Sequence, residues 1–169
     1  MRRLVPSLIV LATTACASTG GVPRPFPTPG GWNPPPLEAS PPPATAAQGG
    51  YAIAGTALSF RGVPYRNGGS DPSGFDCSGL VWYVFAQNGL RVPRTVDEQY
   101  RAGTPIDRSS VGPGDLVFFN TKGAGATHVG ISIGGDEFVH APNTTGEVRV
   151  ERLGANYWMG RFVGARRMN

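Results

Sequence analysis

One cysteine and two histidines are the side chains in this sequence best suited to covalent chemistry. Cys77 lies where a helix is predicted to begin, and the only two histidines follow it at His128 and His140. A cysteine becomes a strong nucleophile as the thiolate, and a helix N-terminus or a nearby imidazolium lowers the thiol pKa toward that state. One cysteine with separated histidines is therefore the expected outline of a thiol hydrolase.

A hairpin turn signal places the two histidines relative to each other. Gly134-Gly135-Asp136 separates two segments with strand character, 127–133 and 137–141. His128 and His140 are equidistant from the first glycine, so we expect them to lie directly opposite each other, with Cβ atoms about 5 Å apart. Together with the cysteine they would form a triad of nucleophile, base and orienting residue.

The first of these two strands has two different faces. The apolar face, which we expect in the core, consists of Val129, Ile131 and Ile133. Gly130 and Ser132 share the other face with His128 and form a small polar surface. This surface is predicted to accommodate the turn that carries Cys77.

Two other uses of these side chains remain open. Cys77 could be an inert buried cysteine and the histidines structural, although the polar and glycine neighbours of Cys77 argue against core packing. Cys77, His128 and His140 could also hold zinc with one open coordination position. No Cys-x-x-Cys, His-x-x-x-His or paired acidic ligands accompany them, so we expect no metal and no cofactor.

The elements that must position these residues are predicted as helices first and strands later. Expected helices span 51–60, 77–88 and 95–101, with Asp76 as the N-cap of the second and Gly89 and Gly103 as stops. Expected strands span 116–119, 127–133, 137–141, 148–153 and 161–166. Because helices and strands hardly alternate, the pattern predicts an α+β fold with an antiparallel sheet.

The N-terminus has the pattern of an export signal. Residues 1–3 include two arginines, residues 4–12 are mostly apolar, and the stretch is too short for an ordinary membrane span. Cleavage after Ala15 would leave Cys16 as the lipid-accepting residue of a bacterial lipoprotein, whereas cleavage after Ala17 would remove it. The short signal favours lipidation. Either cleavage leaves the later cysteine without a disulfide partner, as expected of a functional thiol in an exported chain.

Residues 17–49 are rich in Pro, Gly, Thr, Ser and Ala and cannot bury enough apolar surface to fold. We interpret them as a semi-extended tether between the export signal, residues 1–16, and a single domain, residues 50–169. The formal net charge of +4 falls to about +2 without Arg2 and Arg3. No basic stripe with interleaved aromatics is present, so nucleic acid is not an expected partner.

Four ordered motifs between residue 50 and the C-terminus resemble those of the NlpC-type cell-wall peptidases, which belong to the papain superfamily of cysteine peptidases. The motifs are Phe75-Asp76-Cys77-Ser78-Gly79-Leu80-Val81, Pro113-Gly114-Asp115-Leu116-Val117-Phe118-Phe119, His128-Val129-Gly130-Ile131 and Phe138-Val139-His140-Ala141. The resemblance implies a papain-like core in which the nucleophile helix packs on an antiparallel sheet. It implies Cys77 as nucleophile, His128 as general base and His140 as the residue that orients the base.

The resemblance also implies roles for flanking residues, each with an alternative. Tyr65 would donate its hydroxyl toward the oxyanion, or pack as a loop aromatic. Asp76 and Ser78 would contact the free amine of a stem peptide, as in some members, although Asp76 could be only a helix cap. Arg94 would serve structure or bind a substrate carboxylate. Asp115 is more typical of a turn residue before a strand than of a catalytic acid.

The implied activity is hydrolysis of an amide in peptidoglycan stem peptides, typically between D-γ-glutamyl and a diamino acid, through an acyl-enzyme on Cys77. Two alternatives stay open: a peptidoglycan-binding or scaffold lipoprotein that keeps the fold without turnover, and an acyltransferase that passes the acyl group to an amine. We expect an exported monomer at the cell envelope, anchored to the membrane through lipid on Cys16, on the periplasmic side in a Gram-negative cell.

Overall fold

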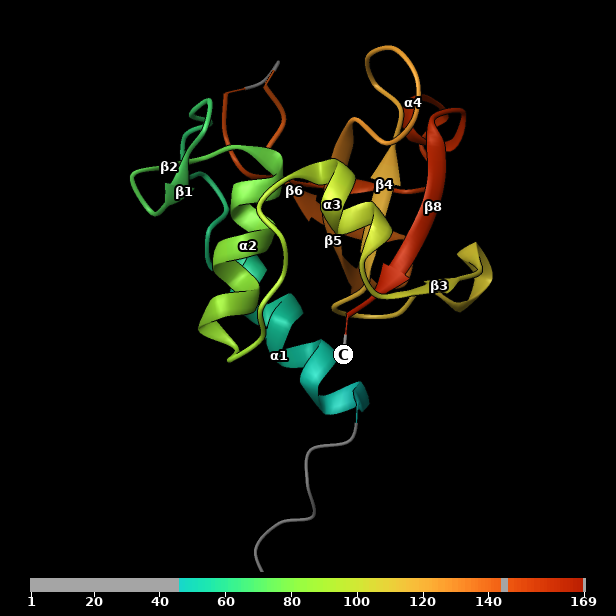
Figure 1. Ribbon diagram of the computed structural model, residues 1–169, viewed down its shortest axis with the longest axis horizontal. Coiled ribbons are helices and arrows are strands. Elements are labelled where there is room, and N and C mark those ends of the chain that lie inside the picture. The colour runs from blue at the N-terminus through green and yellow to red at the C-terminus, as the bar shows by residue number, and fades with distance from the viewer. Residues whose placement is uncertain (1–45, 144–145, 169) are drawn as a thin grey trace, which may run out of the picture. The chain divides into compact units, whose positions relative to one another are not determined.

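The computed structural model describes residues 46–143 and 146–168 (Figure 1). The helices are α1 (Ala46–Leu58), α2 (Cys77–Gln87), α3 (Val96–Arg101) and α4 (Asn156–Met159), and a 3₁₀ turn spans Arg108–Ser110. The strands are β1 (Ser70–Asp71), β2 (Gly74–Phe75), β3 (Thr104–Ile106), β4 (Leu116–Phe119), β5 (His128–Gly134), β6 (Glu137–His140), β7 (Arg149–Arg152) and β8 (Phe162–Arg167). The predicted export signal with Cys16, and most of the predicted tether, lie outside the described residues. Within those residues, no helix has both the length and the apolar character needed to cross a bilayer.

Six strands form one antiparallel sheet in the order β3-β8-β4-β5-β6-β7. β1 and β2 form a separate two-stranded ribbon just before the helix that carries the cysteine. In Figure 1, α1 and α2 lie side by side next to this sheet, and both contact β5. The predicted α+β class with an antiparallel sheet is therefore confirmed.

Some element boundaries differ from those expected. α1 begins at Ala46 rather than Tyr51, so helical structure starts within the segment interpreted as a tether. The ribbon β1–β2, the edge strand β3 and helix α4 were not predicted. Each has only two to four residues, which is too short for hydrophobic periodicity to reveal.

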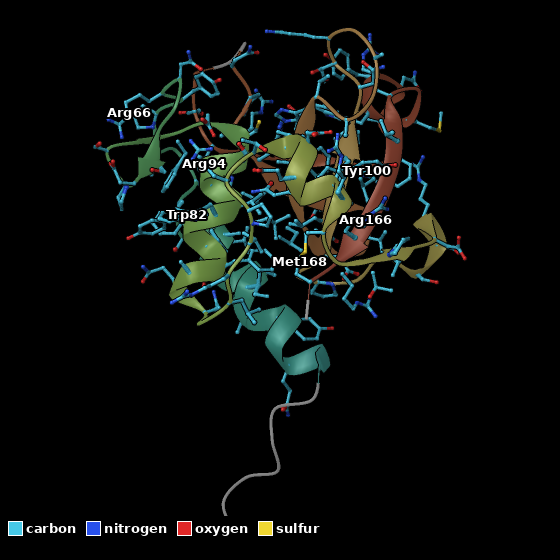
Figure 2. The ribbon with its side chains drawn as sticks, in the orientation of Figure 1. Arg66, Trp82, Arg94, Tyr100, Arg166 and Met168 are labelled. Atoms are coloured by element: carbon cyan, nitrogen blue, oxygen red, sulfur yellow. The ribbon has the colours of Figure 1, made fainter. Side chains whose placement is uncertain are left out.

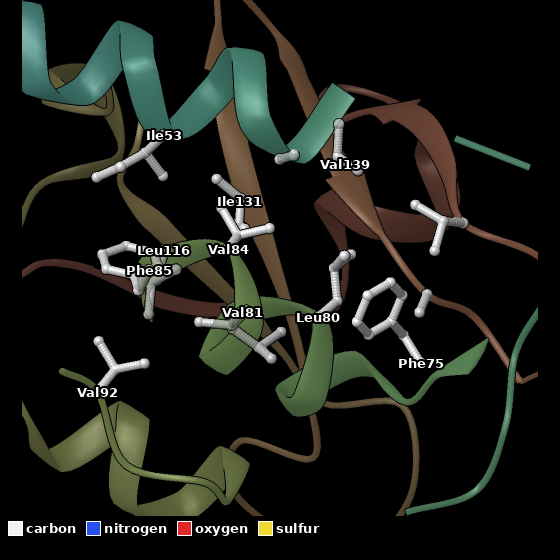
Figure 3. Packing of buried hydrophobic residues seen from close by; sticks show 14 of the residues in the cluster. Ile53, Phe75, Leu80, Val81, Val84, Phe85, Val92, Leu116, Ile131 and Val139 are labelled. Carbon is white, nitrogen blue, oxygen red and sulfur yellow. The ribbon is translucent and has the colours of Figure 1, made fainter. Parts of the chain in front are cut away.

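One face of the sheet carries an aliphatic core beneath α1 and α2 (Figure 3). The buried side chains of α2 recur at helical spacing and meet the apolar side chains of the central strands. The main contributors are Ile53, Leu80, Val81, Val84, Phe85, Leu116, Val129, Ile131 and Val139. Val129 and Ile131 lie here as predicted, with Ile133 packed against the cluster, so this face fixes the position of the α2 N-terminus.

The opposite face carries a smaller, more aromatic core. Its buried members are Val117, Phe119, Phe138, Leu153, Trp158 and Ala165. Phe119 contacts Phe138 and Trp158 at ring-centroid distances of 5.0 and 4.6 Å. The two histidines lie beside this aromatic group, since His128 and His140 both contact Trp158.

Two arginines of β8 contact the turn before β4 and helix α3. Asp115 is buried, accepts a hydrogen bond from the Gly112 N–H at 2.7 Å, and pairs with Arg167 at 2.8 Å. This arrangement agrees with a structural role for Asp115 at the turn before β4. Arg166 stacks over the ring of Tyr100 at 4.2 Å and joins β8 to α3, as the labelled side chains in Figure 2 show.

Candidate active site

Cys77 is the first residue of α2, as the sequence predicts. Asp76 is the N-cap: its backbone is extended, and its carboxylate accepts a hydrogen bond from the Gly79 N–H at 2.6 Å. Backbone N–H groups at the start of a helix lack partners within the helix. Their partial positive charge is therefore available near the thiol of Cys77.

An arginine fastens this helix start to the preceding loop. Arg94 forms a bidentate ion pair with Asp76, at 2.7 and 3.0 Å, and donates to Ser78 Oγ at 2.9 Å and to the Gly69 carbonyl at 3.2 Å. Figure 2 shows Arg94 close to the N-terminal end of α2. Asp76, Ser78 and Arg94 thus form one hydrogen-bonded network at the start of α2.

Two further residues support the same turn. A Cβ at Gly79 would lie 1.9 Å from the Gly69 carbonyl oxygen, so only glycine fits at this position of the motif. Gln99, which is fully buried, donates from Nε2 to the carbonyls of Ser78 and Pro93 at 3.1 and 2.8 Å. The sequence offers no signal for this role of Gln99, because a glutamine in a short helix is usually exposed.

The two histidines meet, but not in the predicted register. Direct opposition of His128 and His140 was wrong, because β5 has a register shift between Ser132 and Gly134. Continuing the observed pairing of Ile131 with Val139 places His140 opposite Gly130, diagonally from His128. Gly130 has no side chain there, and a Cβ would approach the Phe138 ring within 2.5 Å.

The diagonal arrangement still brings the rings into hydrogen-bond contact. His128 Nε2 and His140 Nδ1 are 2.7 Å apart, with the ring planes nearly perpendicular. His140 is fully buried and His128 nearly so. Because Nε2 of His128 is occupied by its partner, Nδ1 is the ring nitrogen that remains for a reacting group.

Cys77 and His128 line one pocket of about 160 Å³, together with Tyr65, Thr121, Lys122, Thr127, Ala141 and Asn143. The expected approach of Cys77 across Gly130 and Ser132 was wrong. α2 packs on the opposite, aliphatic face of β5, and its N-terminus reaches His128 at the beginning of the strand. Tyr65 lies in the same pocket.

Burial dominates the ionisation of these groups. It raises the pKa of the Cys77 thiol to about 11, an effect increased by the Asp76 charge and opposed by backbone N–H groups of Val129, Ser78 and Cys77. Burial also lowers the pKa of His128 to about 4. Burial therefore outweighs the helix N-terminus at Cys77, whose partial positive charge alone would lower the thiol pKa.

The pKa values of the other two ionisable residues, His140 and Tyr65, shift for related reasons. Burial, then the charges of His128 and Arg149, lower the pKa of His140 to about 2. Burial, then the charges of Cys77 and Asp76, raise the pKa of Tyr65. The Tyr65 hydroxyl therefore keeps its proton and can donate a hydrogen bond.

A second cavity of about 310 Å³ adjoins the first at His128. Its other lining residues are Thr121, Lys122, Pro142, Asn143, Glu151, Tyr157 and Trp158. Trp158 stacks on the ring of His128, with the planes 21° apart and the centroids 5.6 Å apart. The sequence analysis missed Glu151 and Trp158. Within residues 46–143 and 146–168, no group of three or more His, Cys, Asp or Glu side chains is arranged to hold a metal ion.

The fold and the site define a papain-like α+β protein, with a cysteine at a helix start and two histidines on adjacent strands. The model of the NlpC/P60 family matches residues 62–167. The chain therefore belongs to the NlpC/P60 family.

Relatives of known sequence and structure agree with this assignment. Murein DD-endopeptidase MepH of Escherichia coli K12 is 48% identical over 112 residues, covering 63% of this chain and 41% of that protein. Gamma-DL-glutamyl hydrolase of Bacillus subtilis 168 is 36% identical over 120 residues, covering 69% of this chain and 29% of that protein. The NlpC/p60 domain of the peptidoglycan hydrolase SagA is similar with a TM-score of 0.62 and 39% identity, covering 70% of this chain and 98% of that domain. The chain spans less than half the length of the two enzymes.

Proposed function

We propose that this chain is a cysteine endopeptidase that hydrolyses amide bonds in the stem peptides of peptidoglycan. One observation carries the proposal: Cys77, at the start of α2, shares a pocket with His128, whose far nitrogen is hydrogen-bonded to His140. The proposed nucleophile, base and orienting group thus lie next to one another in the order Cys77, His128, His140. The names of the relatives, a murein endopeptidase and a peptidoglycan hydrolase among them, supply the substrate class.

The proposed reaction begins from the neutral pair. His128 Nδ1 accepts the proton of Cys77 Sγ as the sulfur attacks the substrate carbonyl carbon, so no free thiolate is required beforehand. The carbonyl oxygen becomes an oxyanion, held by backbone N–H groups at the start of α2 and by the Tyr65 hydroxyl. His128 then gives its proton to the leaving amine as the C–N bond breaks.

Deacylation repeats these roles with water. The leaving amine departs and a water molecule takes its place beside His128, which accepts one of its protons as the water oxygen attacks the thioester carbon. The C–S bond breaks, and the sulfur recovers its proton from His128. His140 keeps the base in orientation throughout, and the chemistry needs no cofactor.

The bond cleaved has two candidates. We propose the D-γ-glutamyl–diamino acid bond, which the resemblance implies. The peptide cross-link is the second candidate, because MepH is named a DD-endopeptidase.

Product masses decide between these bonds. The purified full-length chain would be incubated with two peptidoglycan fragments, an uncross-linked stem peptide and a D,D-cross-linked dimer, with the Cys77→Ala variant as control. Cleavage between D-glutamyl and the diamino acid supports the first candidate, and conversion of dimer to monomer supports the second. Binding without cleavage would favour the binding-module alternative, and transfer of the acyl group to an added amine would indicate a transferase.

We also propose that the protein works at the cell envelope, held by lipid on Cys16. The proposal rests on the export pattern of residues 1–16 and on the peptidoglycan hydrolases among the relatives. Cys16→Ala should move the protein from the membrane fraction to the soluble exported fraction. A mature N-terminus at Ser18 would contradict lipidation, because cleavage after Ala17 removes the cysteine.

A further inference from the structure

The histidine pair has two neutral arrangements, and only one suits the proposed reaction. A single proton lies between His128 Nε2 and His140 Nδ1. If His128 donates it, Nδ1 of His128 keeps its lone pair, and His140 carries its own proton on Nε2. If His140 donates it, His128 carries its proton on Nδ1 and cannot accept the thiol proton of Cys77. The activity therefore requires a group that selects the first arrangement.

Glu151 lies on the side of His140 where this selection would act. His140 Nε2 is buried and has no hydrogen-bond partner among the described residues, and Glu151 Oε1 lies 3.7 Å away. That distance exceeds a hydrogen bond. A carboxylate so close to a fully buried ring nevertheless favours an N–H over a lone pair at Nε2. Hydrogen bonds of catalytic groups are often long without substrate and shorten once it is bound.

The Glu151 carboxylate is itself held by two donors. Arg149 Nε lies 3.0 Å from Oε1, and the Trp158 indole N–H donates to Oε2. Trp158 is 5% exposed. Its ring stacks on His128 and meets His140 edge-on at a centroid distance of 5.0 Å. One indole thus contacts both histidines and holds the carboxylate beside them.

We propose that Glu151 is a positioning residue that fixes the tautomer of the His128–His140 pair, with its carboxylate held by Trp158 and Arg149. Glu151 takes up no proton. When the Cys77 proton reaches His128 Nδ1, the carboxylate stabilises the positive charge shared by the two rings. The consequence for turnover rests on the proposed function, whereas the tautomer is a property of the resting protein.

Nitrogen NMR of the imidazole rings tests the tautomer directly, and the chain contains only two histidines. In the unmodified full-length chain we expect both rings to carry their proton on Nε2. In Glu151→Gln, we expect the amide oxygen to keep accepting the hydrogen bond from the Trp158 N–H. The amide N–H then points toward His140. Both rings should then move their proton to Nδ1. Protonation on Nδ1 in the unmodified chain, or an unchanged spectrum in Glu151→Gln, would overturn the proposal.

A matched control removes another carboxylate from the neighbouring strand. Glu137 is exposed at the start of β6, and Glu137→Gln should leave both tautomers and the turnover unchanged. Glu151→Asp keeps the charge and should retain the Nε2 tautomer. The spectrum of the unmodified chain decides the assignment even if a variant does not fold.

Kinetics give the second readout. Glu151→Gln should lower kcat about 10- to 100-fold, the scale found for carboxylates that orient metal-binding histidines. KM should change less than about twofold, as expected of a residue that acts through His140 rather than on the substrate. A raised KM with unchanged kcat would make Glu151 a substrate contact and contradict the positioning role. If the unmodified chain cleaves no stem peptide, the proposed function fails, and the NMR result still decides the tautomer.

Discussion

The face of the sheet beneath α1 and α2 is aliphatic, whereas the opposite face is aromatic and carries the polar histidine pair. On the first face, closely packed apolar side chains place the N-terminus of α2 and with it Cys77. On the second, a few specific contacts between Trp158, Glu151 and the histidines set ring orientation. Apolar packing thus positions Cys77, whereas a small polar network places the protons of the two histidines. Substitutions on the two faces should therefore have different consequences.

The largest effect is expected from the aliphatic face. Phe85 is a fully buried residue near the C-terminal end of α2, so Phe85→Ala should lower the free energy of unfolding by about 3–5 kcal/mol. Activity per folded molecule should stay within about twofold, because Phe85 does not line the pocket and lies about two helical turns from Cys77. Urea unfolding and titration of active protein would measure both. A large activity loss in fully folded Phe85→Ala would contradict the separation of the two faces.

The histidines on the aromatic face should make the free energy of unfolding depend on pH. The unfolded chain takes up a proton on His128 near pH 6.5, but the folded chain only near pH 4, so the unfolded state binds more protons between these values. The free energy of unfolding should therefore fall as pH drops from about 6.5 to 4, by about 3 kcal/mol from this residue. Urea unfolding at several pH values measures the slope. His128→Gln should reduce the slope by about half, because His140, whose pKa is lowered to about 2, contributes a similar slope over the same range. An equally steep curve in that variant would count against the assignment.

The thiol on the aliphatic side should react slowly at neutral pH. Because burial raises the pKa of Cys77 to about 11, its alkylation rate should rise about tenfold per pH unit between pH 7 and 9. Peptide mass mapping after timed iodoacetamide treatment measures the rate at Cys77, with a free cysteine peptide as control. Equal rates at pH 6 and pH 8 would instead indicate a thiolate–imidazolium pair at rest.

The smallest effect is expected from Trp158→Phe. The ring still fills most of the space, so the stability should change by less than about 1.5 kcal/mol. The indole N–H that holds Glu151 is lost, and kcat should fall about tenfold. Trp82→Phe, on the exposed side of α2 (Figure 2), is the matched control and should leave kcat unchanged. Equal effects of both substitutions would remove the special role of the aromatic face.

The aliphatic face could be predicted from the sequence because its signals are local. Asp76 caps the helix as its position indicated, and the apolar spacing from Leu80 to Phe85 marked the buried side. The same local signals identified His128 and His140 as neighbours on adjacent strands.

The details of the histidine face could not be predicted, because they depend on tertiary contacts. A register shift near the end of β5 changes which residues face each other, and no residue pattern marks it. Glu151 and Trp158 reach the histidines through β7 and the short helix α4. The raised thiol pKa likewise follows from burial, which the helix-start motif does not encode.

The most direct test of the account is the turnover of Cys77→Ala. Cleavage of one defined stem peptide would be followed by mass for the unmodified chain and for this variant, with urea unfolding to confirm that both are folded. We expect the variant to unfold like the unmodified chain and to lose turnover by more than about 10³-fold. Turnover retained in folded Cys77→Ala would contradict the central claim that this thiol attacks the substrate.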